Sequence, residues 1–138
     1  MRTHLEFTAE RFGGPDARPN GNDTIFGAEL AEFLGDAFRA KGMSGTVIEE
    51  DWGWMVELKS DPFPVWLGCA SYGDGEPGVC GNDWLVFIEP SQPEIRRWFK
   101  KIDTRAEVEA VAGELETILI NAGATNLQWW SDANSGRK

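Results

Sequence analysis

Histidine and cysteine are scarce in this chain, which has one His and two Cys among its 138 residues. A Cys/His zinc site takes four ligands of these types, and a disulfide scaffold needs more than two cysteines, so both are excluded. Catalysis by an imidazole-activated Ser or Cys would have to use His4. We expect His4 at the surface or at the end of the first strand, and the sequence predicts neither a metal centre nor a cofactor.

Phosphate-binding and membrane-spanning motifs are also missing. The spacing Gly73-x-Gly75-x-x-Gly78 leads into an apolar run typical of a strand, whereas a dinucleotide-binding loop must open a helix. No apolar run approaches the roughly 18–20 residues of a membrane span, and residues 1–7 lack the apolar segment of a signal peptide. We therefore expect a cytoplasmic protein whose two cysteines are reduced, although their proximity in sequence would allow a bridge under oxidation.

Positive charge is in short supply, with 13 Lys and Arg against 23 Asp and Glu and a net charge of −10. The whole excess lies in residues 1–90, because residues 91–138 hold seven basic and seven acidic side chains. Such a field repels nucleic acid and anionic membranes and favours a partner with a basic surface. The alternative interpretation is that the acidity serves solubility.

Apolar residues are present in ordinary amount, at 41%, and Trp is abundant, with seven copies. A chain of this length and composition predicts one domain with its own core. We place this domain at residues 1–131 and expect residues 132–138 to form a disordered tail.

The hydrophobic periodicity of residues 1–90 predicts a strand, a helix and then three further strands. Alternation predicts a first strand over residues 5–9, and a four-then-three spacing predicts a helix over residues 24–41. Three apolar runs without a helical crossover then predict an antiparallel meander, at residues 46–59, 65–70 and 84–88.

The C-terminal third is typical of two helices and a strand. A capping box at Ser91–Glu94 precedes Ile95, Trp98, Phe99 and Ile102, whose spacing indicates one face of a helix. A second capping box begins at Thr104 and predicts a longer helix, followed by a strand over 127–130. The predicted order is β-α-β-β-β-α-α-β, an α+β domain with a mainly antiparallel sheet and helices on one face.

The segment from Glu50 through Asp51 and Trp52 to Trp54 is the first candidate binding site. Glu50 has the strand parity of the apolar residues around it, so either a bulge lies near Gly53 or a carboxylate points inward. A carboxyl group beside Trp can serve as a general acid, and acids with Trp rings also form sugar-binding or cation-binding surfaces. Alternatively, the acids face water while the Trp side chains fill the core.

The Gly-rich segment 71–83 is the second candidate, because long loops often bind ligands. Its candidate binding residues are Tyr72, Asp74 and Asp83. A flexible connector is the alternative.

The run Arg96-Arg97-Trp98-Phe99-Lys100-Lys101 is the third candidate. On a helix its four cations would share one face, with Arg96 and Arg97 as candidate binding residues for an anion or an acidic partner. The alternative is a solvated face that balances the acidic remainder of the chain.

Trp129 and Trp130 form the last candidate. Neighbouring side chains on a strand point to opposite faces, so one of these rings is expected to be accessible to a partner. Pairing of two copies through this terminal edge strand would be its simplest use.

Three motifs together resemble a family of small bacterial proteins to which no activity is assigned. They are Glu50-Asp51-Trp52-Gly53-Trp54, Trp66-Leu67-Gly68-Cys69 and Phe87-Ile88-Glu89-Pro90. The resemblance extends from Thr3 to about Trp130 and implies a compact domain in the bacterial cytosol. It implies no catalytic residue.

These observations favour a non-enzymatic acidic domain that binds a partner protein, with a basic partner surface preferred. By analogy of size and charge, it is similar to immunity or antitoxin-like proteins. One alternative is a small-molecule or carbohydrate site, potentially hydrolytic, built on Glu50, Asp51, Trp52 and Trp54. Another is a structural homodimer. Neither nucleic acid nor a membrane is expected as a partner.

Overall fold

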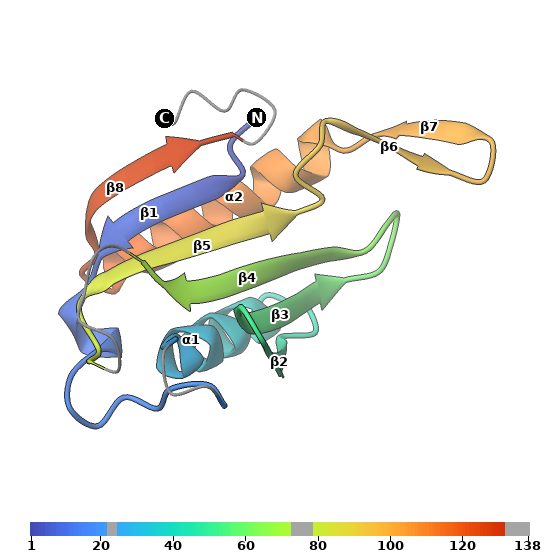
Figure 1. The fold of residues 1–138 in the computed structure, drawn as a ribbon. Helices are drawn as coiled ribbons and strands as arrows, with labels where there is room; N and C mark the ends of the chain where they lie inside the picture. The colour runs from blue at the N-terminus through green and yellow to red at the C-terminus, as the bar shows by residue number, and fades with distance from the viewer. Residues whose placement is uncertain (22–24, 73–78, 132–138) are drawn as a thin grey trace.

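The computed structural model describes residues 1–21, 25–72 and 79–131, which form two helices, a short 3₁₀ turn and eight strands (Figure 1). In chain order the elements are β1 (His4–Thr8), η1 (Glu10–Phe12), α1 (Ala28–Arg39), β2 (Thr46–Glu50), β3 (Gly53–Lys59), β4 (Val65–Ser71), β5 (Asp83–Glu89), β6 (Glu94–Arg97), β7 (Lys100–Asp103), α2 (Arg105–Asn121) and β8 (Thr125–Trp130). Within this part of the chain, neither helix is long and apolar enough to cross a bilayer. The predicted tail, residues 132–138, lies outside the described residues.

Six strands form one antiparallel sheet in the order β2-β3-β4-β5-β1-β8. The first strand lies between β5 and the last strand, β8, so the two ends of the chain meet in the sheet. Both helices cover the same face, with α1 behind β2 to β4 and α2 behind β5 and β1 (Figure 1). The predicted α+β class, the antiparallel meander and the helices on one face are confirmed.

The core lies between the sheet and the two helices. Alternate strand residues point into it, among them Leu5 and Phe7 of β1 and Val65, Leu67 and Cys69 of β4, each at most 3% exposed. The helices contribute their apolar faces, listed as Ala28, Leu30, Ala31, Leu34 and Phe38 from α1 and Val108, Val111, Ala112, Leu115 and Leu119 from α2. The period-two and helical patterns therefore identify the core correctly.

The strand predicted over residues 46–59 is wrong, because the chain reverses at Asp51 and Trp52 to form the β2–β3 hairpin. Gly53 makes this reversal possible, with a φ of +148° that side chains rarely adopt. A Cβ atom at this position would lie 2.4 Å from the carbonyl oxygen of Cys69. A turn therefore takes the place of the bulge or the inward-pointing Glu50 considered from the sequence.

The helix predicted after Ser91 is also wrong, since residues 94–103 form the hairpin of β6 and β7. Ile95 is opposite Ile102, and Trp98 and Phe99 form the two-residue turn. Trp98 adopts a φ of +59°, as a tight hairpin turn requires. A spacing of 3, 1 and 3 residues places four apolar side chains on one helix face, and it equally places two Ile side chains opposite each other across a two-residue turn. The periodicity could not separate these structures.

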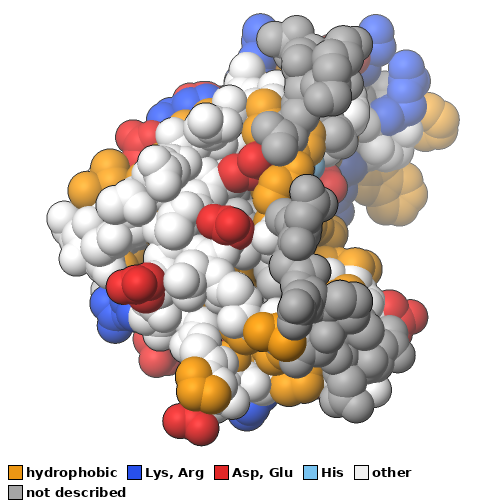
Figure 2. Space-filling view, turned by 60° about the vertical axis from the view of Figure 1, so that its left-hand side comes forward, with side chains coloured by type: hydrophobic (Ala, Val, Ile, Leu, Met, Phe, Trp, Pro, Cys, Tyr) orange, Lys and Arg blue, Asp and Glu red, His pale blue; other side chains and the backbone are white. Residues whose placement is uncertain are grey.

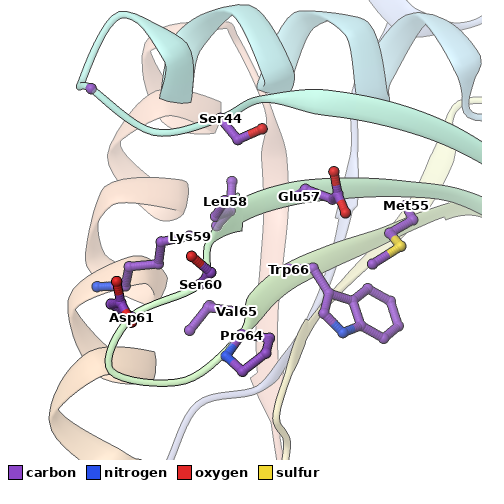
Figure 3. Close-up of a pocket in the computed structure, with 11 residues that line it drawn as sticks. Ser44, Met55, Glu57, Leu58, Lys59, Ser60, Asp61, Pro64, Val65 and Trp66 are labelled. Carbon is purple, nitrogen blue, oxygen red and sulfur yellow. The ribbon is translucent and has the colours of Figure 1, made fainter.

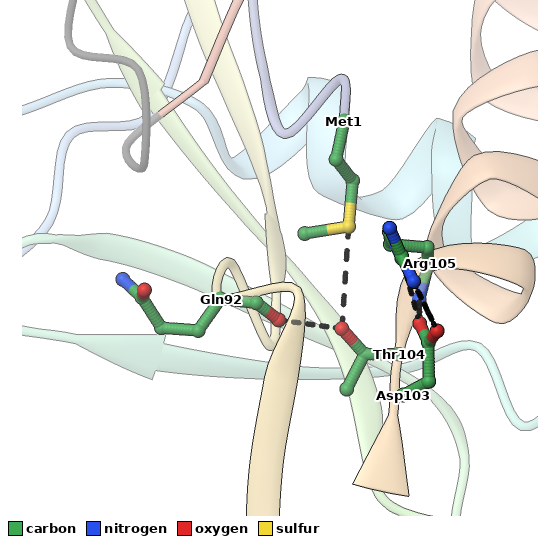
Figure 4. Close-up of polar contacts among 5 residues, drawn as sticks. All are labelled: Met1, Gln92, Asp103, Thr104 and Arg105. Atoms are coloured by element: carbon green, nitrogen blue, oxygen red, sulfur yellow. Dashed lines mark hydrogen bonds and ion pairs between the residues drawn. The ribbon is translucent and has the colours of Figure 1, made fainter.

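Thr104 anchors the base of this hairpin to the domain (Figure 4). Its side chain is fully buried, its N–H donates to the carbonyl of Pro93 at 3.0 Å, and its hydroxyl donates to the carbonyl of Gln92. The helix α2 begins directly after Thr104, as predicted, but the hydroxyl does not cap it. Beside it, the Arg105 guanidinium lowers the pKa of Asp103 to about 2 through side-chain hydrogen bonds.

We expect Thr104→Val to destabilise the protein by about 1–3 kcal/mol, because the buried Thr104 side chain loses its hydrogen bond to the carbonyl of Gln92 while its shape is retained. Urea denaturation measures this change. Thr125→Val is the matched control, since Thr125 is exposed on β8, and it should change stability by less than about 0.5 kcal/mol. Equal effects of the two substitutions would contradict the anchoring role.

Candidate functional site

The face of the six-stranded sheet opposite the helices, here called the open face, carries the residues of the other strand parity. One row of directly paired positions crosses the whole sheet: Ile48, Met55, Gly68, Phe87, His4 and Trp130. Most members of this row are aromatic or aliphatic, although no helix of the described chain covers them (Figure 1). The open face is therefore a largely apolar surface in a polar chain.

Five rings form a connected group on the open face, here called the aromatic cluster: His4, Trp52, Trp66, Phe87 and Trp130. His4 stacks on Trp130 with centroids 4.1 Å apart and on Phe87 at 5.7 Å. Phe87 in turn contacts Trp52 at 5.3 Å and Trp66 at 5.8 Å. The cluster thus joins the last strand, β8, to the β2–β3 turn.

Packing and hydrogen bonds fix the rings in position. The Trp130 indole N–H donates to Glu6 Oε2 at 2.7 Å, and Thr3 Oγ1 lies 2.8 Å from His4 Nδ1. His4 is only 8% exposed, whereas Trp52 at the other end of the cluster is 37% exposed. The cluster therefore presents an ordered aromatic surface, with Trp52 as its most accessible ring.

Gly68 creates the space for the centre of the cluster. A Cβ atom at Gly68 would lie 2.1 Å from the terminal carbon of the Phe87 ring, so this ring rests directly on the glycine backbone. The arrangement resembles the pairing of an aromatic side chain with a cross-strand glycine in designed sheets. Any larger residue would force Phe87 away from its neighbours.

Acidic side chains surround this apolar surface. Five strand positions of the open face are acidic, namely Glu6, Glu50, Glu57, Asp83 and Glu89. The one Lys or Arg in the six strands, Lys59, follows a register shift in β3 and is opposite Val65 of the core. The Lys59 ammonium pairs with Glu107 of α2. In Figure 2 the open face is turned toward the right, where hydrophobic side chains gather with acidic ones beside them.

A groove lies at the end of the sheet formed by the β3–β4 loop (Figure 3). Its volume is about 620 Å³, and Leu58, Val65 and Trp66 supply apolar walls. Glu57 and Asp61 contribute carboxylates to the same lining. The groove is within the size range of small-molecule sites.

The structure separates the four candidate residues of the segment 50–54. Glu50 is half-buried at the end of β2, and Asp51 and Trp52 are exposed in the turn. Trp54 is 5% exposed on the helix-covered face, where it packs beside Gly27. Trp52 and Trp54 therefore lie on opposite faces of the sheet and do not line one site.

The second candidate segment contributes to a different place. Tyr72 and Asp83 line a polar pocket of about 270 Å³ beside Glu6 and Thr8, and the Tyr72 N–H donates to the carbonyl of Asp83 at 3.0 Å. Asp74 lies outside the described residues. The residues of the third candidate, Arg96 and Arg97, lie on the exposed β6 strand, away from segment 50–54 and from the Tyr72 pocket.

The two Trp residues of β8 point to opposite faces, as predicted. The Trp129 indole N–H donates to Glu116 of α2 at 2.7 Å, and Arg2 lies over its ring at 5.2 Å. Trp130 belongs to the aromatic cluster on the open face. Its ring is half-buried against His4, so it is less accessible to a partner than the sequence alone suggested.

The described thiols are poorly suited to nucleophilic chemistry. Both are free, and burial raises the pKa of the Cys69 thiol far above its ordinary value. Burial also raises the pKa of Cys80. Thiolate is the reactive form, so neither side chain is activated. Among the described residues, no group of three His, Cys, Asp or Glu side chains is arranged to hold a metal ion.

Sequence reasoning missed His4, Trp66 and Phe87 as members of one surface. Each has the strand parity opposite to the core residues, so the alternation already indicated that they leave the core. What the alternation could not supply was the register that places these strands side by side.

We expect Gly68→Ala to destabilise the protein by about 1–3 kcal/mol and to alter the near-ultraviolet circular dichroism of the Trp rings, because the new methyl group displaces Phe87. Urea denaturation and the spectrum of the folded variant measure the two effects. Gly113→Ala is the control, since its Cβ would meet only Arg2 Nη2 at 4.0 Å on helix α2. It should be neutral or stabilising, by up to about 1 kcal/mol. A folded Gly68→Ala protein with an unchanged spectrum would contradict the assignment.

Comparison of the chain with protein-family models, with curated proteins and with solved structures found no match. The resemblance to a family of small bacterial proteins therefore stays a prediction from the motifs alone.

Proposed function

We propose that the protein is a non-enzymatic binding domain whose open face engages a partner protein with a basic surface. The observation that carries this proposal is the aromatic cluster, an ordered set of rings left uncovered on one face of a sheet and bordered by carboxylates. Immunity proteins, which neutralise toxins, provide an analogy of size and charge.

The aromatic cluster has the properties of an interface centre. Large aromatic side chains contribute most to binding when they are already held in one conformation, because little conformational entropy is then lost. His4 and Phe87 are held by stacking, and Trp130 by its bond to Glu6. Trp52 remains accessible enough to bury further area against a partner.

The charge around the cluster supports a basic partner. Glu57 is exposed beside Trp66, while Glu89 and Glu50 are half-buried on the same face. Acidic groups around an apolar centre attract Lys and Arg of a partner, accelerate association and reject acidic surfaces. This local arrangement is consistent with the net charge of −10.

The alternative small-molecule site receives less support from the geometry. It requires Glu50, Asp51, Trp52 and Trp54 to converge, whereas Trp54 is buried behind the sheet. The groove of Figure 3 is a separate place, lined by different residues.

We expect Trp52→Ser to abolish capture of the partner from lysate of the organism that encodes the protein, in parallel captures with the wild-type chain at low and moderate salt. Ile120→Ser is the matched control, because Ile120 is also exposed but lies on α2. A protein lost with Trp52→Ser and retained with Ile120→Ser is then identified by mass spectrometry and purified. Capture of no protein with this dependence would contradict the proposal.

Titration calorimetry with the purified partner tests the aromatic and the electrostatic contributions to binding separately. Trp52→Ala should raise the dissociation constant by roughly thirtyfold, as expected for an aromatic residue at an interface centre. Glu57→Lys should raise the dissociation constant and reduce its dependence on salt. An acidic partner, or one bound more tightly by Glu57→Lys, would contradict the predicted charge preference.

A further inference from the structure

The hairpin of β6 and β7, here called the arm, extends away from the six-stranded sheet (Figure 1). Its turn carries the two most exposed large hydrophobic side chains among the described residues, Trp98 at 88% and Phe99 at 95%. Apolar side chains of this size in adjacent turn positions are not needed for folding, because they contact no core. Their exposure indicates a role in binding.

The outer residue pairs of the arm weaken the pairing of its two strands. Arg96 is directly opposite Lys101, and Arg97 is directly opposite Lys100, and like charges in such pairs oppose strand pairing. A two-stranded ribbon is only marginally stable in water even without this repulsion. Ile95 and Ile102 pack against the core, so the fold holds the base of the arm more firmly than its outer half.

The arm differs in charge from every other part of the molecule. Its outer half contains Arg96, Arg97, Lys100 and Lys101, four of the 13 basic residues, so nine basic residues remain elsewhere against 23 acidic ones. The body of the chain is acidic and therefore complements the basic arm. The tip of the arm points away from the body of its own chain (Figure 1), so Trp98 and Phe99 do not contact that body.

The groove beside the β3–β4 loop fits the tip of the arm in place and in chemistry. The Arg97 guanidinium donates to the carbonyl of Pro62 at 3.4 Å, so the arm and this loop lie at the same end of the molecule. The groove offers about 620 Å³ with an apolar wall at Trp66 and carboxylates at Glu57 and Asp61. Because arm and groove are neighbours, two copies related by a twofold axis can exchange arms reciprocally.

We propose that the arm binds a second copy of the chain, with Trp98 and Phe99 inserted in the groove of the partner copy and the four arm cations facing its carboxylates. An aromatic side chain buries about 150–250 Å². Four such side chains bury roughly 600–1,000 Å² of their own surface. The groove surfaces that they cover bring the interface to about 1,000 Å², the lower limit of a specific contact.

Sedimentation equilibrium of the full chain between about 1 and 200 µM tests the proposal. The wild-type protein should approach twice the 15.3 kDa chain mass at the upper concentrations. Trp98→Ser with Phe99→Ser should weaken dimerisation roughly thirtyfold or more, as expected for the loss of aromatic interface residues. Ile120→Ser removes an exposed apolar side chain on α2 and should leave the dimer unchanged. Far-ultraviolet circular dichroism verifies that each variant is folded.

Charge reversal identifies the site to which the arm binds. Asp61→Lys in the groove, and Lys100→Glu with Lys101→Glu in the arm, should each weaken self-association. An equimolar mixture of the two variants should recover dimers, because the reversed arm of one chain then faces the reversed groove of the other. Recovery in the mixture supports the proposal, and its failure while each variant is folded overturns the assignment of the groove.

A monomeric wild-type protein at 200 µM overturns the proposal, as does a dimer insensitive to the tip substitutions. Co-sedimentation with vesicles of phosphatidylcholine and phosphatidylserine, and a gel-shift assay with duplex DNA, cover the other surfaces that a basic and aromatic arm can bind. Tip-dependent binding of either by a monomeric protein also overturns it. The capture test of the open-face proposal is unaffected by these outcomes, because it depends on Trp52, which does not line the groove.

Discussion

Burial of one face of the sheet under two helices is the interaction on which the rest of the structure depends. Side chains alternate along the strands, so those that fill the core on one face determine which side chains remain on the other. Leu5 and Phe7 enter the core, and His4 consequently enters the open face. The aromatic cluster is therefore a direct result of the same alternation that forms the hydrophobic core.

Much of this architecture follows from the sequence, because the core patterns are long and regular. The meander, α1, α2 and the opposite orientations of Trp129 and Trp130 all follow from periods of two and 3.6. Two segments could not be predicted in this way. A single exposed turn at Asp51 and Trp52 interrupts an otherwise continuous apolar pattern, and the spacing from Ile95 to Ile102 fits a helix and a hairpin equally well.

The candidate surfaces were harder to predict than the core, and the reason is physical. An aromatic cluster depends on strand order and register, which bring together residues as distant in sequence as His4 and Trp130. The segment 50–54 contains the right residue types, yet the reversal before Gly53 sends Trp52 and Trp54 to opposite faces. Local composition indicated aromatic and acidic chemistry, and only the register determined which groups share a surface.

The two proposed surfaces differ in chemistry and are held differently. The open face is acidic, and its rings are fixed by stacking and by hydrogen bonds from opposite ends of the chain. The arm is basic at its outer half and is anchored mainly at its base, through Thr104 and the Ile95–Ile102 pair. One chain thus combines a preorganised surface with an element that a binding partner would stabilise.

The position of β1 between β5 and β8 also constrains how the chain can fold during synthesis. The first strand leaves the ribosome early, but its two neighbours end at Glu89 and Trp130. Leu5 and Phe7 therefore have to wait, without their native strand partners, until most of the chain has been translated. Completion of the sheet therefore requires β8, and one edge of β1 stays unpaired on the nascent chain until residues 125–130 have been translated.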